Sequence, residues 1–111
     1  MKTLRFEQSF ISDDASYIWD GESITAEFSE KEIEEIKDLI QVIDKHNLFC
    51  VEKSFDKPFT IFDDEGDEVE NDEWRYGVDT VKVYNTYSVY VIFQHKHNSQ
   101  AVVEFELVDK I

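Results

Sequence analysis

The C-terminal third of the sequence alternates between apolar and polar residues, and this alternation constrains the fold more than any other feature. Three such runs cover residues 74–84, 86–94 and 101–108, with polar turns near Asn85 and at 97–99. Successive side chains of a strand point to opposite faces, so each run has one face to bury. The rows expected to be buried are Tyr87, Val89, Val91 and Phe93 on the middle strand and Val103, Phe105 and Leu107 on the last. A three-stranded antiparallel meander is the simplest arrangement.

A single amphipathic helix is predicted over residues 30–46. Ser29 is followed three positions later by Glu32, the spacing at which each side chain bonds the other's backbone N–H in a capping box. Lys45 and His46 suit the negative end of the helix dipole, and Asn47 suits the left-handed residue that ends a helix. The apolar residues recur at helical spacing and give the helix one face to bury: Ile33, Ile36, Leu39, Ile40 and Ile43.

The N-terminal part adds further strands. Residues 3–11 alternate loosely and residues 23–28 read as a strand, with Asp20-Gly21 resembling a hairpin turn just before it. Two shorter extended pieces are expected at 48–52 and 59–62.

Together these elements predict an α+β fold. An antiparallel sheet of about five to six strands is expected, with the helix packed on one face. With 111 residues, no internal repeat and no linker, residues 1–111 are expected to form a single domain.

Charge narrows the range of partners. The chain has 26 acidic and 11 basic residues, a net charge of −15, yet its 41% hydrophobic content is too high for a disordered acidic tail. An acidic field repels phosphates and anionic lipid headgroups, so direct nucleic-acid or membrane binding is not expected. A basic protein surface is the natural complement.

A cytoplasmic location is expected. Cys50 is the only cysteine, which rules out a disulfide within the chain and a cysteine-based zinc site. The first residues lack the apolar core of a signal peptide, and no apolar run reaches membrane-spanning length.

The most distinctive segment is an acidic run at residues 63–73, expected to be an exposed loop. It does not fit a calcium loop, because placing Gly66 at the sixth position puts Ile61 where a carboxylate is required. Two aromatic residues close to it would either anchor an interface or form the buried face of a strand. The candidate partner-binding residues are Asp63, Asp64, Glu65, Asp67, Glu68, Glu70, Asp72, Glu73, Trp74 and Tyr76.

A second acidic cluster surrounds the first turns. It consists of acids flanking two aromatic rings, and it would extend the same surface if the fold brings the two segments together; turn chemistry alone also explains its aspartates. Its members are Asp13, Asp14, Tyr17, Trp19, Asp20 and Glu22.

Catalytic signatures are weak. His95 and His97 have a spacing that can hold zinc, but no third ligand is marked, and they read as surface residues near a turn. Cys50 lies in an apolar strand, where an unreactive thiol is expected. Glu35 and Lys37 have a spacing seen in some nucleases but lie on the helix, where they read as surface charges. No catalytic residue, metal site or cofactor is predicted.

These observations favour a binding protein over an enzyme. The leading hypothesis is a small inhibitor of the immunity type that covers the active site of a basic partner, a cognate bacterial nuclease toxin. The alternative is a nucleic-acid mimic that blocks a DNA-binding defence protein, of the anti-restriction or anti-CRISPR type. A small metal-dependent enzyme and a housekeeping adaptor remain further alternatives.

Overall fold

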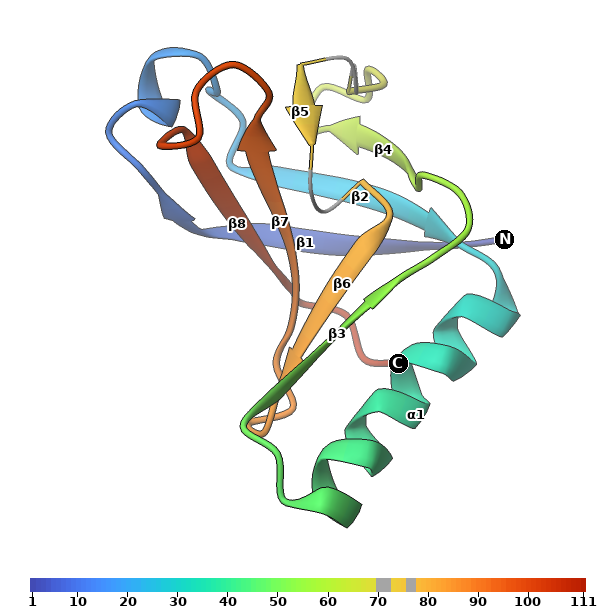
Figure 1. The fold of residues 1–111 in the computed structure, drawn as a ribbon. Helices are drawn as coiled ribbons and strands as arrows, with labels where there is room; N and C mark the ends of the chain where they lie inside the picture. Colours follow the sequence, from blue (N-terminus) through green and yellow to red (C-terminus); the bar gives the residue numbers. More distant parts are fainter. Residues whose placement is uncertain (70–72, 76–77) are drawn as a thin grey trace.

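The structure, a computed structural model, describes residues 1–69, 73–75 and 78–111. Figure 1 shows the arrangement of its elements along the chain. In order they are β1 (Lys2–Ile11), the short 3-10 helix η1 (Ala15–Tyr17), β2 (Ser23–Phe28), α1 (Glu30–His46), β3 (Cys50–Ser54), β4 (Thr60–Asp63), β5 (Trp74–Arg75), β6 (Thr80–Tyr84), β7 (Val89–His95) and β8 (Val102–Leu107).

The fold is α+β, as predicted. Among the described residues, the strands form one sheet in the order β3-β6-β7-β8-β1-β2-β4, and β5 pairs with β7 beside this path. Every pair is antiparallel. The predicted C-terminal meander is present as β6-β7-β8, and the sheet contains more strands than the five to six expected.

The sheet is strongly curled. Helix α1 contacts β6 and β3 near one end of the strand order, and also β2 near the other end (Figure 1). A flat sheet could not present both ends to one helix, so the sheet bends around the core and the helix covers its open side. The helix therefore packs chiefly on β6, β2 and β3.

The two edge strands, β3 and β4, follow each other in the chain, and the segment 55–59 joins them across the open side. The backbone N–H of Phe55 donates to the Asp79 carbonyl at 2.7 Å, and that of Phe59 donates to the Val78 carbonyl. The Phe59 ring lies 4.4 Å from the Phe28 ring and 5.3 Å from the Phe55 ring, centroid to centroid. These aromatic contacts help to close the core where the sheet itself does not.

Alternation predicts the buried face of the meander except at Tyr87, and Leu107 in the last row is partly buried. Val89, Val91, Phe93, Val103 and Phe105 are all buried. The placement of Tyr87 in this row is wrong: it has a φ of 67° and is 57% exposed. It belongs to the turn between β6 and β7, where its N–H donates to the carbonyl of Tyr84 at 2.9 Å.

Two other predictions change in detail. The expected strand at 74–84 is divided: β5 pairs with the end of β7 through Trp74↔His95, and β6 pairs with its start through Val83↔Val89. The connection between β1 and β2 is a longer segment containing η1 and not a two-residue turn at Asp20-Gly21. β1 and β2 nevertheless pair with each other, antiparallel.

The helix matches its prediction. The Ser29 N–H donates to Glu32 Oε1 at 2.7 Å, and the Glu32 N–H donates to Ser29 Oγ at 3.1 Å, which completes the capping box. Asn47 ends the helix with a left-handed φ of 52°. Ile33, Ile36 and Ile43 are buried against the sheet, with Leu39 and Ile40 partly buried beside them. Within the described part of the chain, no helix combines the length and apolar character needed to span a membrane.

Replacing Ser29 by Ala is expected to lower the free energy of unfolding by about 1 kcal/mol, because it removes the cap of the Glu32 N–H. Urea denaturation followed by circular dichroism measures the change. The exposed turn residue Ser99 offers a matched control, and Ser99→Ala should cost less than about 0.5 kcal/mol. Equal losses in the two variants would show that the cap does not stabilise the helix.

Candidate functional site

The start of the acidic run is an ordered turn that we call the acidic hairpin, residues 63–69. Asp63 Oδ1 accepts hydrogen bonds from the N–H groups of Glu65 and Asp67, both at 2.9 Å. Gly66 has a φ of 87°, a left-handed conformation in which a side chain would be strained. The Val69 N–H donates to the Ile61 carbonyl at 2.8 Å and ties the returning chain to β4. Residues 63–69 of the predicted loop therefore form a hydrogen-bonded turn, and most of them are exposed to solvent.

Strand pairing brings the acidic hairpin to the second acidic cluster. β4 lies beside β2 with Ile24 opposite Asp63, so the hairpin follows β4 directly next to the residues that precede β2. The Glu22 N–H donates to Asp64 Oδ2 at 3.4 Å, and the Trp19 Nε1–H donates to the Gly21 carbonyl at 3.0 Å. Two segments far apart in the sequence thus meet at one place.

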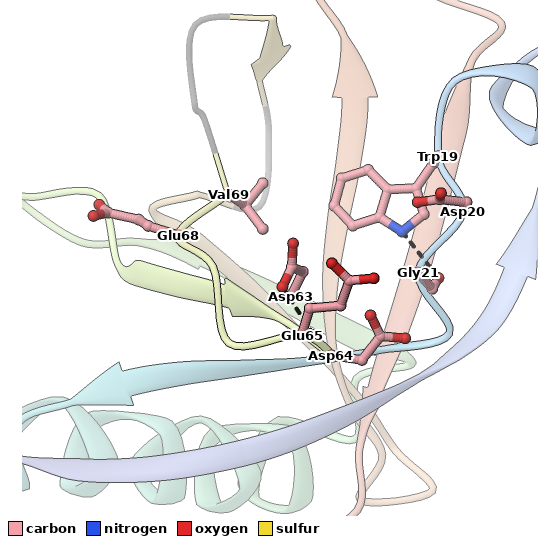
Figure 2. A pocket seen from close by; sticks show the side chains of 8 residues that line it. All are labelled: Trp19, Asp20, Gly21, Asp63, Asp64, Glu65, Glu68 and Val69. Carbon is pink, nitrogen blue, oxygen red and sulfur yellow. Dashed lines mark hydrogen bonds between the residues drawn. The ribbon is translucent and has the colours of Figure 1, made fainter.

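A cleft of about 370 Å³ lies between them, and we call it the acidic cleft (Figure 2). Figure 2 shows Trp19 forming one wall, while Glu68 points away from the other acids. Its described lining contains five carboxylates and neither Lys nor Arg. The lining residues are Trp19, Asp20, Gly21, Asp63, Asp64, Glu65, Glu68 and Val69.

The acidic surface continues beyond the cleft. A second hollow of about 470 Å³ shares Asp64 with the first and is lined also by Glu7, Gln8, Glu22 and Ser23. Glu7 was not among the residues predicted from the sequence, because its place beside Asp64 depends on the pairing of β1 with β2. A nearby cation, Arg5, is already held by Glu7 at 3.2 Å.

Aromatic rings support the cleft from beneath. Trp19 packs edge-on against Trp74 with 5.2 Å between ring centroids, and it also contacts Phe93 at 5.4 Å and Phe105 at 5.5 Å. Trp74 is only 6% exposed and belongs to the core. Of the two interpretations of Trp74, an interface anchor or a core residue, its position matches the second. Trp19 is the ring that reaches the cleft.

The structure separates the predicted site residues into three groups. Those that meet around the acidic cleft and the adjoining hollow are Trp19, Asp20, Glu22, Asp63, Asp64, Glu65 and Glu68. Those that lie elsewhere are Asp13, Asp14 and Tyr17 around η1, Asp67 in the exposed turn of the hairpin, Glu73 beside β5, and Trp74 in the core. Glu70, Asp72 and Tyr76 fall outside the described residues.

Around η1 the predicted cluster has a structural role. Asp14 accepts a hydrogen bond from Asn98 Nδ2 at 2.9 Å and so connects this turn to the turn before β8. Tyr17 is 86% exposed and does not line the cleft.

The histidines form a local structural contact. The His97 N–H donates to His95 Nδ1 at 3.2 Å, and the Trp74 ring lies edge-on to His95 at 5.1 Å. His95 Nε2 lies 3.9 Å from Glu73 Oε2. Among the described residues, no group of three or more His, Cys, Asp or Glu side chains is arranged to hold a metal ion.

Comparison of the chain with protein-family models, with curated proteins and with solved structures finds no match. The acidic cleft and its charge are therefore the basis on which a function can be argued.

Replacing Asp63 by Ala should loosen the acidic hairpin, because the N–H groups of Glu65 and Asp67 lose the carboxylate that accepts their hydrogen bonds. Amide hydrogen exchange at Val69, which bonds to Ile61, is expected to become about fivefold faster or more. Glu65→Ala removes the same charge and leaves the Glu65 N–H in place, so exchange at Val69 should change little. Equal acceleration in both variants would contradict the role assigned to Asp63.

Replacing Trp74 by Ala should lower the free energy of unfolding by about 3–5 kcal/mol, because the ring is buried against Trp19 and His95. Thermal or urea denaturation measures the loss. Tyr17→Ala, at an aromatic residue that is 86% exposed, should cost less than about 1 kcal/mol. A Trp74 variant as stable as the parent would show that its ring does not support the cleft.

Proposed function

We propose that this protein is a small inhibitor of the immunity type, which binds a basic partner protein through the acidic cleft and neutralises it. The leading candidate for the partner is a cognate bacterial nuclease toxin whose active site the cleft would cover. One observation carries the proposal: the pairing of β2 with β4 gathers acids from two distant segments around one hollow whose described lining has no basic residue.

The chemistry of a nuclease fits this surface. A site that grips phosphates presents Lys and Arg side chains, and an array of carboxylates can pair with them. Single exposed ion pairs contribute little, about 0.2–1 kcal/mol each, so several must act together. The cleft offers such a group, with the Trp19 ring beside it as a surface for an Arg or Lys side chain.

Long-range attraction adds to this local fit. A net charge of −15 accelerates encounter with a positively charged partner and makes the association rate dependent on salt. We assign no catalytic residue, metal or cofactor to the chain, and we place its action in the cytoplasm.

A second candidate, mimicry of nucleic acid, is favoured by the extension of the acidic surface. Asp64, Glu22 and Glu7 line one continuous hollow, and Glu7 stands opposite Glu106 across the β1·β8 pair. A row of carboxylates of this kind can imitate successive phosphates and occupy a DNA-binding protein. The concave cleft favours the inhibitor, while the row favours the mimic.

The two candidates can be tested together by affinity purification at low salt from the cells that make the protein, with release by increasing salt. An eluted basic nuclease supports the inhibitor, and an eluted DNA-binding defence protein supports the mimic. Recovery of neither, or a partner that stays bound in high salt, contradicts both.

Neutralising the cleft should weaken binding of that partner by about tenfold or more at low salt. The variant carries Asp20→Asn, Asp64→Asn, Glu65→Gln and Glu68→Gln, and isothermal titration measures the Kd. A matched control removes the same charge elsewhere on the exposed surface, with Glu30→Gln, Glu34→Gln, Asp38→Asn and Asp56→Asn. The control should weaken binding by less than about threefold. Equal effects would mean that net charge, and not the cleft, drives binding.

A further inference from the structure

A bulge in β1 turns an aromatic ring out of the core. Leu4 and Phe6 alternate on the buried face of β1, and the same alternation would bury Phe10. The register of β1 on β8 shifts between Gln8 and Phe10, so that Phe10 stands opposite Glu104 and is 49% exposed. Bulges commonly redirect a side chain at positions next to a functional site.

Phe10 lies at a groove on the outer face of the sheet. Tyr84 and Tyr90 alternate with the buried residues Val83, Val89 and Val91, so their rings point away from the core. Together with neighbouring residues they line an open hollow of about 350 Å³, which we call the outer-face groove. Its lining consists of Ser9, Phe10, Tyr84, Thr86, Tyr90 and Glu104.

The rings of this face stand at right angles to one another. Tyr84 and Tyr90 meet edge-on at 5.3 Å and 86°, and Phe49 meets Tyr84 at 5.6 Å and 84°. Phe49 is 69% exposed, so the aromatic surface extends beyond the groove. Exposed aromatic rings that contact each other are the side chains from which binding surfaces are commonly built.

Carboxylates border the groove. Glu104 lines it, and Glu106 stands opposite Tyr90 across the β7·β8 pair. Burial raises the pKa of the Tyr90 phenol, and the charges of Glu106 and Glu104 add to the rise. The phenol therefore stays neutral and able to donate a hydrogen bond at neutral pH. A cation of the same face, Lys82, lies 5.2 Å from the centre of the Tyr84 ring and 3.8 Å from Glu52.

We infer that the outer-face groove binds a basic, proline-rich segment of another protein in the polyproline II conformation. Proline rings pack between aromatic side chains, and the backbone carbonyls of this conformation make no internal hydrogen bonds. The phenol hydroxyl groups of Tyr84 and Tyr90 can donate to those carbonyls, while Glu104 and Glu106 pair with an Arg or Lys of the segment.

Other occupants fit less well. A strand cannot be added here, because β7 is paired on both edges and β8 lies between β7 and β1. A helix is about 10–12 Å across, and a groove of about 350 Å³ holds only a few side chains. A second copy of the chain would also carry a charge of −15, and its acidic residues would face Glu104. Like-charge repulsion opposes this arrangement. This inference does not depend on the proposed function.

The test uses the whole protein and three synthetic peptides, followed by NMR chemical shifts and isothermal titration. The first peptide is proline-rich with an Arg at each end, the second has alanines in place of the prolines, and the third has Glu in place of each Arg. The first should shift the amide signals of Phe10, Tyr90 and Glu104, and the other two should bind at least about tenfold more weakly. Binding of the alanine peptide as tightly as the first would overturn the inference.

Variants locate the site. Phe10→Ser, at an exposed ring, and Tyr90→Phe, which keeps the ring and removes the hydroxyl, should each weaken the first peptide, with Phe10→Ser costing about tenfold or more. Tyr17→Ser removes an exposed ring that lies outside the groove and should leave the Kd unchanged, as should Asp64→Asn in the acidic cleft. The absence of shifts at millimolar peptide, or a dimer in sedimentation that Phe10→Ser abolishes, would overturn the inference.

Discussion

Strand β2 is hydrogen-bonded along both edges, to β1 and to β4, and the acidic face depends on this double pairing. Its inward residues Ile24, Ala26 and Phe28 are all buried, which fixes the face of the strand that meets the core. Because a shift of one residue would turn that face outward, the register with β4 is strongly specified. The acidic hairpin is consequently held beside Trp19 and Asp20 by the core itself.

Concentrating negative charge on a small protein has an energetic cost. Self-repulsion of a chain with a charge of −15 disfavours the compact state, and the hairpin places several acids close together. The fold offsets this repulsion with its aromatic core, where Trp19 contacts three buried rings. Local hydrogen bonds add to this, because the Asp63 carboxylate accepts hydrogen bonds from two backbone N–H groups. A charge distribution kept at such a cost is consistent with a role in recognition.

Local patterns in the sequence predicted the features that depend on neighbouring residues. The helix from Ser29 to Asn47 follows from a cap and an apolar stripe, and the meander follows from alternation. Contacts between distant segments could not be predicted in this way. The meeting of Glu22 with Asp64 requires the β2·β4 pairing, and the outward turn of Phe10 requires a bulge that alternation does not reveal. Trp74 illustrates the same limit, because a strand residue beside charges reads equally well as an anchor or as core.

Hydrogen exchange of the protein with and without its purified partner tests the central claim most directly. Binding through the acidic cleft should slow exchange together at residues 20–22 and 61–69, two segments joined only by the fold, and leave exchange along the exposed face of α1 unchanged. Protection confined to α1, or to one of the two segments without the other, would contradict the account.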